Sequence, residues 1–415
     1  MPPCRPAAPV SLRSNFAWTF AGNAFYAAGQ WAILSLAAKL GGREMLGQYA
    51  LAVAVTTPVV MLSHLNLRAV LATDMDQRHP FGDYLAVRLA TTALGLGAIA
   101  AIAWAAGYRG PLAAVILATG AAQSVENVSD IYYGAMQRRE RMDRIARSMM
   151  ARGAVSLAAF GAALWATGNL VAAVAALGLG RTAVLAVYDQ PRGSAGERLS
   201  RSGWPTGWTI ARTALPLGVV LMLVSLNTNL PRYAIERTLG TLELGAFAAA
   251  ASFVTVGSTM VNAIGQAATP RLARYASEHD PKRFLRLSFQ LAGLALALGA
   301  AGVLAAALLG KLVLSLVYRP EYATYSGVLV AALAAAGLGY VAATFGYAIT
   351  AARAFNAQAP LFCAVAASCG LAAWILVPRF GLYGAVMALA AASCVQIAGE
   401  AWILARALAA MEPAA

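Results

Sequence analysis

This chain has little charge for its length. Only 12% of its 415 residues are Asp, Glu, Lys or Arg, whereas 60% are hydrophobic. A typical soluble domain has about 25% charged residues. The polar stretches are mostly shorter than about twelve residues, a usual length for connections between neighbouring helices, so none of them can hold a soluble catalytic domain. These features exclude an ordinary water-soluble globular protein.

Cysteine and histidine are also scarce. The chain has four cysteines and three histidines, at positions 4, 363, 369 and 394 and at positions 64, 79 and 279. Their spacings match neither a metal-ligand motif nor a disulfide framework. We therefore expect neither a metal site nor a thiol enzyme. We also expect no cofactor, and the short connections predict no enzymatic activity.

Long apolar runs fill almost the whole chain. Twelve of them are about as long as a helical bilayer crossing, which takes about 20 residues. In hydrocarbon each backbone donor and acceptor must be satisfied within its own segment, so these runs are predicted to be helices. The predicted fold class is an all-α polytopic membrane protein with about 12 transmembrane helices. The predicted spans are 16–40, 46–72, 84–107, 111–135, 149–167, 170–188, 210–234, 242–269, 284–309, 324–350, 359–377 and 382–405.

The basic residues predict the orientation in the membrane. Of the 31 Lys and Arg residues, 22 lie at or just inside one set of helix ends and 8 lie at the opposite set. An excess of Lys and Arg marks the cytoplasmic side, so both termini are predicted to be cytoplasmic. The net charge of +14 needs no nucleic-acid partner, because anionic lipid head groups can balance it.

The longest polar connection divides the chain evenly. It is rich in Gly, Ser, Pro and Arg and follows the sixth predicted span. We therefore predict two six-helix lobes around a central cleft. The predicted division is a cytoplasmic tail at 1–14, an N-lobe at 15–188, a cytoplasmic linker at 189–209, a C-lobe at 210–405 and a cytoplasmic tail at 406–415.

The two halves resemble each other at an offset of 198 residues. The segment GREMLGQYA at 42–50 matches GTLELGAFA at 240–248. In the second span Thr57, Met61, His64 and Arg68 form a polar stripe, and residues 255, 259, 262 and 266 keep its spacing in the eighth span. These matches indicate a parallel repeat about an axis along the membrane normal. A chance match in a chain rich in Ala, Leu and Gly is the alternative.

Polar side chains interrupt several spans. Asn23, Tyr26 and Gln30 share one face of the first helix, and Asn227 lies in the seventh. Such faces avoid lipid and line either protein or a water-filled cavity. We favour a hydrated cleft, with ordinary hydrogen bonding between helices as the alternative.

Charged residues inside the spans are costlier and therefore more informative. Glu126 and Asp130 share one face of the fourth span, and Arg181 lies within the sixth. They could form a structural ion pair or a proton- or cation-coupled switch. Arg68 and Arg212 lie near the predicted cytoplasmic face, where they either extend to the interface or bind an anionic head group.

Several motifs resemble a known family. They are NFAWTFAGN at 15–23, LGQYALA at 46–52, Pro58, LNLR at 65–68, ATD at 72–74 and QRRERMD at 137–143. Together they are similar to the polysaccharide and O-antigen flippases of bacterial inner membranes, within the multidrug/oligosaccharidyl-lipid/polysaccharide exporter superfamily. The resemblance implies two six-helix lobes around a central cleft.

The resemblance also implies a function. It is the movement of a polyprenyl-pyrophosphate-linked oligosaccharide from the cytoplasmic to the external leaflet, by alternating access, for surface polysaccharide biosynthesis. Membrane lipids and polysaccharide-assembly proteins such as a polymerase are the implied partners, and Arg68 and Asp74 match the motif region near the cytoplasmic mouth. The predicted residues for substrate or head-group binding are Arg68, Arg181, Arg212, Asn23, Gln30, Asn227, Asn262 and Gln266. Those predicted for coupling or gating are Glu126, Asp130, Asp74 and Glu400.

Two alternatives stay open. A multidrug or small-molecule antiporter would share this fold, but the multidrug branch typically has an acidic residue in the first span, where this chain has Asn23 and Gln30. A membrane glycan polymerase or ligase would need a large external loop, and the longest external connection, around 311–323, is short. The coupling ion and the glycan are left open by the sequence.

Overall fold

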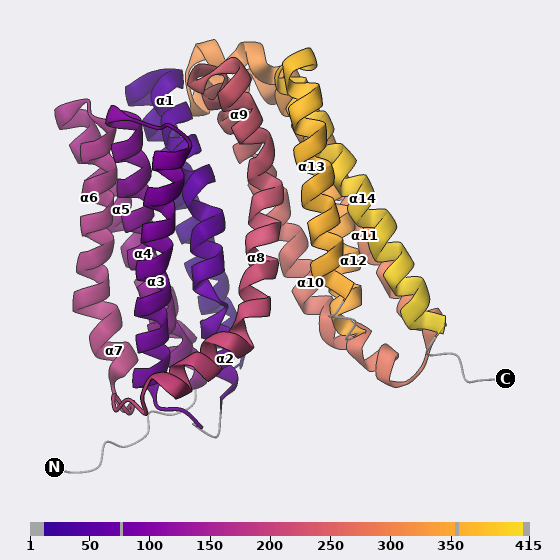
Figure 1. Ribbon diagram of the computed structural model, residues 1–415. Coiled ribbons are helices and arrows are strands. Elements are labelled where there is room, and N and C mark those ends of the chain that lie inside the picture. The colour runs from indigo at the N-terminus through magenta and orange to yellow at the C-terminus, as the bar shows by residue number, and fades with distance from the viewer. Residues whose placement is uncertain (1–11, 75–77, 353–356, 410–415) are drawn as a thin grey trace. The chain divides into compact units, whose positions relative to one another are not determined.

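The computed structural model describes residues 12–74, 78–352 and 357–409 (Figure 1). All regular secondary structure in this part of the chain is helical, which confirms the all-α prediction. The elements are α1 (Leu12–His64), α2 (Leu67–Thr73), α3 (Phe81–Ala105), α4 (Gly110–Arg138), α5 (Met142–Thr167), α6 (Leu170–Val184), the π-helical segment η1 (Leu185–Asp189), α7 (Gln190–Ser194), α8 (Trp204–Leu239), α9 (Thr241–Ser252), α10 (Val254–Ser277), α11 (Pro281–Val317), the 3₁₀ segment η2 (Pro320–Tyr325), α12 (Ser326–Ala351), α13 (Gln358–Phe380) and α14 (Leu382–Ala409).

These helices account for the twelve predicted spans. Ten helical segments of the described chain are long and apolar enough to cross a membrane. The first of them, Ala17–Thr73, is 57 residues long and contains two crossings, because α1 breaks at Gly42 (φ 77°, ψ −172°). The fourth predicted span, α4, is not among the ten, since polar and charged residues interrupt its apolar sequence.

The helix ends differ from the predicted ones in two informative places. Leu65 and Asn66 have positive φ values of 50° and 49° and separate α1 from α2 inside the second predicted span. At the start of the predicted linker, Asp189 lies within a continuous helix, because α6 passes through η1 into α7 and ends only at Ser194. The stretch between helices is therefore 195–203.

The chain folds into two compact units. The first comprises the described parts of Met1–Leu40 and Val55–Val219, and the second those of Gly41–Ala54 and Val220–Ala415. In the first unit α4 packs against α3 and α6, and α5 packs against α6 (Figure 1). In the second unit α12 packs against α10, α11 and α14. The second unit thus takes in a short piece of α1.

The beginning of α8 and the stretch before it are held on the first unit. Ile210 and Ala214 are buried in a cluster with Phe81 of α3. The backbone N–H of Ser202 donates to Asp83 Oδ1 at 2.8 Å, and the Arg138 guanidinium forms an ion pair with Glu197. Arg138, one of the basic residues that the sequence analysis uses only to predict the topology, therefore also binds the connection between the halves.

Within the second unit, two glycines from the repeated segment pack face to face. A Cβ added at Gly47 would lie 1.8 Å from the carbonyl oxygen of Thr241, and one added at Gly245 would lie 2.0 Å from that of Arg43. Both pairs are related by the offset of 198 residues. A contact in which each copy uses the same surface indicates a local two-fold relation, so this geometry supports an internal repeat over chance similarity.

Candidate functional site

A network of buried charges runs through the first unit, centred on α4. Asp130 contacts three basic side chains from three other helices. Its carboxylate lies 2.8 Å from His64 Nε2 of α1, 3.3 Å from an Arg68 nitrogen of α2 and 3.4 Å from an Arg88 nitrogen of α3. Burial removes water from charged groups, and such groups are tolerated when they are paired and hydrogen-bonded. Asp130 therefore joins three helices through one carboxylate.

Arg88 is fully buried, and its two terminal nitrogens bond to protein partners, while its Nε has no hydrogen-bond partner in the described chain. Its Nη1 donates to the side-chain oxygen of Asn127 at 2.6 Å and to the carbonyl oxygen of His64 at 2.7 Å. Asn127 in turn donates to the hydroxyls of Ser63 and Thr92, each at 3.2 Å. These contacts, together with its complete burial, indicate that Arg88 positions Asp130.

Glu126, one turn before Asp130 on α4, organises a second group of side chains. Arg181 of α6 lies 2.8 Å from its carboxylate, and the hydroxyl of Tyr26 on α1 donates to it. Nearby, Arg152 of α5 pairs with the buried Asp189 at 2.8 Å. The network as a whole therefore holds four guanidinium groups against three carboxylates.

A cavity of about 230 Å³ opens beside this network. Arg68 lines it with 30% of its side chain exposed, and its guanidinium lies 5.6 Å from the centre of the Tyr133 ring. The guanidinium is held by Gln137 at 2.8 Å as well as by Asp130. Because Arg68 is accessible and the network carries one excess positive charge, the cavity is suited to an anionic group.

The second unit contains a larger cavity, of about 720 Å³. Thr255 and Asn262 of α10 line it, and Thr57 and His64, at the same offset of 198 residues, line the cavity of the first unit. Each half therefore uses positions of the repeated polar stripe to line a cavity of its own, all four in the first unit and two in the second. Within the described chain, the only charged residues that line the cavity of the second unit are Arg232 and Glu400.

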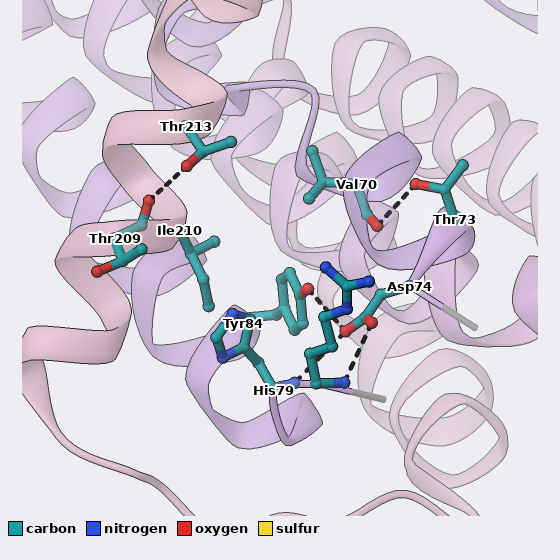
Figure 2. Close-up of a pocket in the computed structure, with 9 residues that line it drawn as sticks. Val70, Thr73, Asp74, His79, Tyr84, Thr209, Ile210 and Thr213 are labelled. Carbon is teal, nitrogen blue, oxygen red and sulfur yellow. Dashed lines mark hydrogen bonds between the residues drawn. The ribbon is translucent and has the colours of Figure 1, made fainter. Parts of the chain in front are cut away.

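A third cavity, of about 370 Å³, lies in the first unit between the end of α2 and the beginning of α8 (Figure 2). Asp74 lines this cavity and accepts several hydrogen bonds from residues close to it in sequence. Its carboxylate accepts from the backbone N–H groups of Arg78 and His79, at 3.1 and 3.4 Å, and from the hydroxyl of Tyr84 at 3.0 Å. Thr209 and Thr213 of α8 line the other side.

No group of three or more His, Cys, Asp or Glu residues in the described chain is arranged to hold a metal ion. The carboxylates of the network contact arginine, histidine, serine and tyrosine side chains instead. Their arrangement is that of ion pairs among protein groups.

Solved structures with the same architecture are transporters. An inward-facing multidrug-resistance MATE transporter of the MOP superfamily aligns with a TM-score of 0.75 at 14% identity, over 95% of this chain and 98% of that one. The chain has the fold of a MOP-superfamily transporter. Lipid II flippase MurJ, in an inward closed conformation, shares this fold with a TM-score of 0.71 at 10% identity, over 95% of this chain and 90% of that one.

A MOP-superfamily transporter from Pyrococcus furiosus, whose binding pocket is described as having reverse polarity, aligns with a TM-score of 0.64 at 16% identity over 96% of this chain and 95% of that one. Among curated proteins, the chain is 25% identical over 383 residues to the capsular polysaccharide biosynthesis protein CapF of Staphylococcus aureus, which covers 90% of this chain and 94% of CapF. No family model matches the chain. These likenesses confirm the suspected resemblance and the membrane-transporter fold, and the structural neighbours are transporters and flippases.

Within this transporter fold, some of the predicted site residues come together. Glu126, Asp130, Arg68 and Arg181 belong to one network, in which Arg181 takes Glu126 as its partner. Three others line the cavity of the second unit, and Asp74 lines the third cavity. The three in the second unit are Asn227, Asn262 and Glu400.

Four predicted residues lie elsewhere. Asn23 is exposed and donates to the carbonyl oxygen of Thr19 one turn earlier, at 2.7 Å. Gln30 is partly buried, whereas Arg212 and Gln266 are exposed, and none of the four lines the three cavities described above. Tyr26, between Asn23 and Gln30 on the same helix, is the residue of the first span that reaches the charge network.

Sequence reasoning assigned no site role to Arg88 or Arg152, which were counted only as topology charges. The sequence did contain a signal that Arg88 could pair with Asp130. Arg88 lies seven residues after the start of α3 and Asp130 eight residues before the end of α4, so at 1.5 Å per residue both lie about 11 Å from neighbouring helix ends. Matched depth on adjacent antiparallel helices is what an ion pair requires.

Proposed function

We propose that this chain is a flippase that moves a polyprenyl-pyrophosphate-linked oligosaccharide from the cytoplasmic to the external leaflet by alternating access, for surface polysaccharide biosynthesis. Support comes from the likeness to CapF over most of both chains and from the fold shared with the lipid II flippase. The observation that carries the proposal is the accessible Arg68 in the cavity of the first unit, beside a network with one more guanidinium group than carboxylates.

Physical chemistry links that cavity to such a substrate. A glycan cannot cross hydrocarbon unaided, because each buried hydroxyl without a hydrogen-bond partner costs about 1–3 kcal/mol or more. A pyrophosphate adds negative charge, which a guanidinium binds through two parallel N–H donors. Arg68 has its guanidinium anchored at two points by Gln137 and Asp130 and remains partly exposed, as a phosphate-binding arginine would.

Export of a small molecule or drug is the competing function, because multidrug transporters share the fold. The charge of the network beside the cavity favours the lipid-linked substrate. Four guanidinium groups against three carboxylates repel a cationic drug and attract an anionic head group. We therefore place the pyrophosphate in the first unit, with Arg68 as the contacting residue.

Replacing Arg68 by alanine should lower flipping of a fluorescent polyprenyl-pyrophosphate disaccharide about ten- to hundredfold, because a hydrogen bond to a charged group is worth about 1.5–3 kcal/mol. Arg68→Lys should restore only part of the rate, since an ammonium lacks the planar fork. The measurement is loss of fluorescence to an impermeant external quencher in proteoliposomes. Arg274→Ala, which removes an exposed guanidinium paired with Glu278, is the matched control.

Unchanged flipping by Arg68→Ala at equal protein in the liposomes would remove Arg68 from substrate binding. Efflux of cationic dyes by the wild-type chain, without flipping of the lipid, would replace the proposal with drug export.

We also propose that the chain resides in a bacterial inner membrane with both termini cytoplasmic, that the lobes correspond to 15–188 and 210–405, and that polysaccharide-assembly proteins such as a polymerase are its partners. The excess of basic residues at one set of helix ends supports this orientation. A C-terminal epitope that antibodies reach in intact cells, before the membrane is opened, would contradict it.

A further inference from the structure

We propose that the 720 Å³ cavity of the second unit is a carbohydrate subsite, which binds one or two sugar rings of the transported molecule. This inference rests on the proposed function and deepens it, because it gives the glycan a place separate from that of the pyrophosphate. The cavity falls within the range of about 300–1,000 Å³ that is typical of small-molecule sites.

The space exists because one face of α12 is built from small residues. Successive turns of this face line the cavity with alanine or glycine at positions 332, 335, 336, 339, 343 and 346. Side chains this small leave the helix backbone open to a ligand. The cavity is therefore a feature of the helix sequence, repeated over about four turns.

Two tyrosines interrupt the small face, and each is seated against a glycine of α10. A Cβ added at Gly257 would lie 2.3 Å from the hydroxyl of Tyr340, and one added at Gly265 would lie 2.2 Å from the ring of Tyr347. The hydroxyl of Tyr340 is fixed by the carbonyl oxygen of Val254 at 2.7 Å. Aromatic rings combine apolar surface with a polar edge, which suits the C–H face of a sugar ring.

Buried polar atoms in the wall of the cavity lack partners within the described chain. Glu400 is 1% exposed; one carboxylate oxygen accepts from Gln396 at 3.0 Å, and the other has no hydrogen-bond partner within the described chain. The side-chain oxygen of Asn227 and the Nε of Arg232 are likewise buried without one. Buried polar groups are normally satisfied. Sugar hydroxyls, which both donate and accept, fit this mixed set.

The charges of the two cavities favour different parts of the substrate. In the second unit the one arginine and the one glutamate that line the cavity balance, and its other lining residues are uncharged. The cavity of the first unit is lined by two arginines and two carboxylates, and the network behind them adds two arginines and one carboxylate, which leaves one excess positive charge. A neutral polar ligand therefore belongs in the second unit, and a pyrophosphate in the first.

The experiment measures sugar binding to the full chain in lipid nanodiscs. The probes are D-glucose, N-acetyl-D-glucosamine and D-glucuronate. Their binding is measured by saturation-transfer NMR. We expect wild-type protein to bind at least one probe with millimolar affinity. Glu400→Gln, which keeps the shape but loses the charge, and Asn262→Ala should each weaken binding about tenfold. Thr269→Ala, on α10 outside the cavity and with its hydroxyl bonded to Gly265, should leave binding unchanged.

A second variant tests the space itself. Gly339→Leu should abolish sugar binding by filling the cavity, since a Cβ at Gly339 meets only the Ser393 hydroxyl at 3.5 Å and leucine favours a helix. Its thermal unfolding midpoint should stay at or above that of wild type, which separates occlusion from misfolding.

Three results would overturn the subsite. The first is that wild-type protein binds none of the three sugars. The second is that Glu400→Gln, Asn262→Ala and Gly339→Leu all bind sugar as well as wild-type protein does. The third is that the protein binds Na⁺ in a way that depends on Glu400 and binds no sugar. In each case flipping that still depends on Arg68 would leave the proposed function intact. Loss of that dependence, with sugar binding retained, would instead indicate that the chain exports a saccharide without a pyrophosphate anchor.

Discussion

Replacing Asp130 by alanine is expected to lower the free energy of unfolding by about 3–5 kcal/mol. The change leaves Arg88, whose side chain is fully buried, without its only carboxylate within the described chain, and it also removes the partner of His64 and an anchor of Arg68. A buried charge stripped of its partner costs far more than the pair itself contributes. The measurement is equilibrium unfolding of the purified protein in detergent.

The control for this variant is an ion pair of the same kind on the surface. Arg274 and Glu278 lie on α10 with side chains 62% and 48% exposed. Glu278→Ala should change the free energy of unfolding by less than about 0.5 kcal/mol. If Asp130→Ala unfolded at the same denaturant concentration as Glu278→Ala, the network would have to be hydrated, and the argument for a preorganised anion site would fail.

The chemistry of this network was partly predictable from the sequence. Glu126 and Asp130 share a helix face, and intramembrane carboxylates require partners, so their importance followed from spacing alone. The choice of partners did not, because a single sequence does not say which neighbouring helix faces α4. In the structure Arg181 pairs with Glu126, and the arginines of α2 and α3 pair with Asp130.

The twelve spans were predictable because hydrocarbon forces each long apolar run into a helix. The ends were not, because tertiary contacts set them. Pro58 lies within α1 without ending it, whereas Leu65 and Asn66 interrupt the helix with no glycine or proline nearby. Asp189 was predicted to begin a polar linker, but pairing with Arg152 holds it inside a helix.

The cavity of the second unit shows a different limit. Asn227, Asn262 and Glu400 were predicted because polar groups stand out in an apolar span. The residues that give the cavity its shape are glycines and alanines of α12, together with Tyr340 and Tyr347. In a chain rich in these small residues, no local pattern distinguishes a face that leaves space from one that packs against a neighbouring helix.

Replacing Gly47 by alanine should destabilise the protein by about 1–3 kcal/mol, a typical cost of overpacking. The added methyl would lie 1.8 Å from the carbonyl oxygen of Thr241, so backbone atoms must move apart. Gly245→Ala should have a similar effect, because its methyl would collide with the equivalent carbonyl oxygen of Arg43. Thermal unfolding midpoints in detergent measure both.

A double variant, and a control glycine at which an added Cβ meets no other atom, make this test specific. Because Gly47 and Gly245 occupy one contact, separating the segments once relieves both collisions, and the double variant should cost less than the sum of the single ones. Gly293→Ala, on α11 with nothing within 4 Å of the added Cβ, should instead stabilise the protein by up to about 1 kcal/mol. Equal effects of the three single changes, with the effects of Gly47→Ala and Gly245→Ala adding up in the double variant, would show that the repeated segments do not meet as the two-fold contact requires.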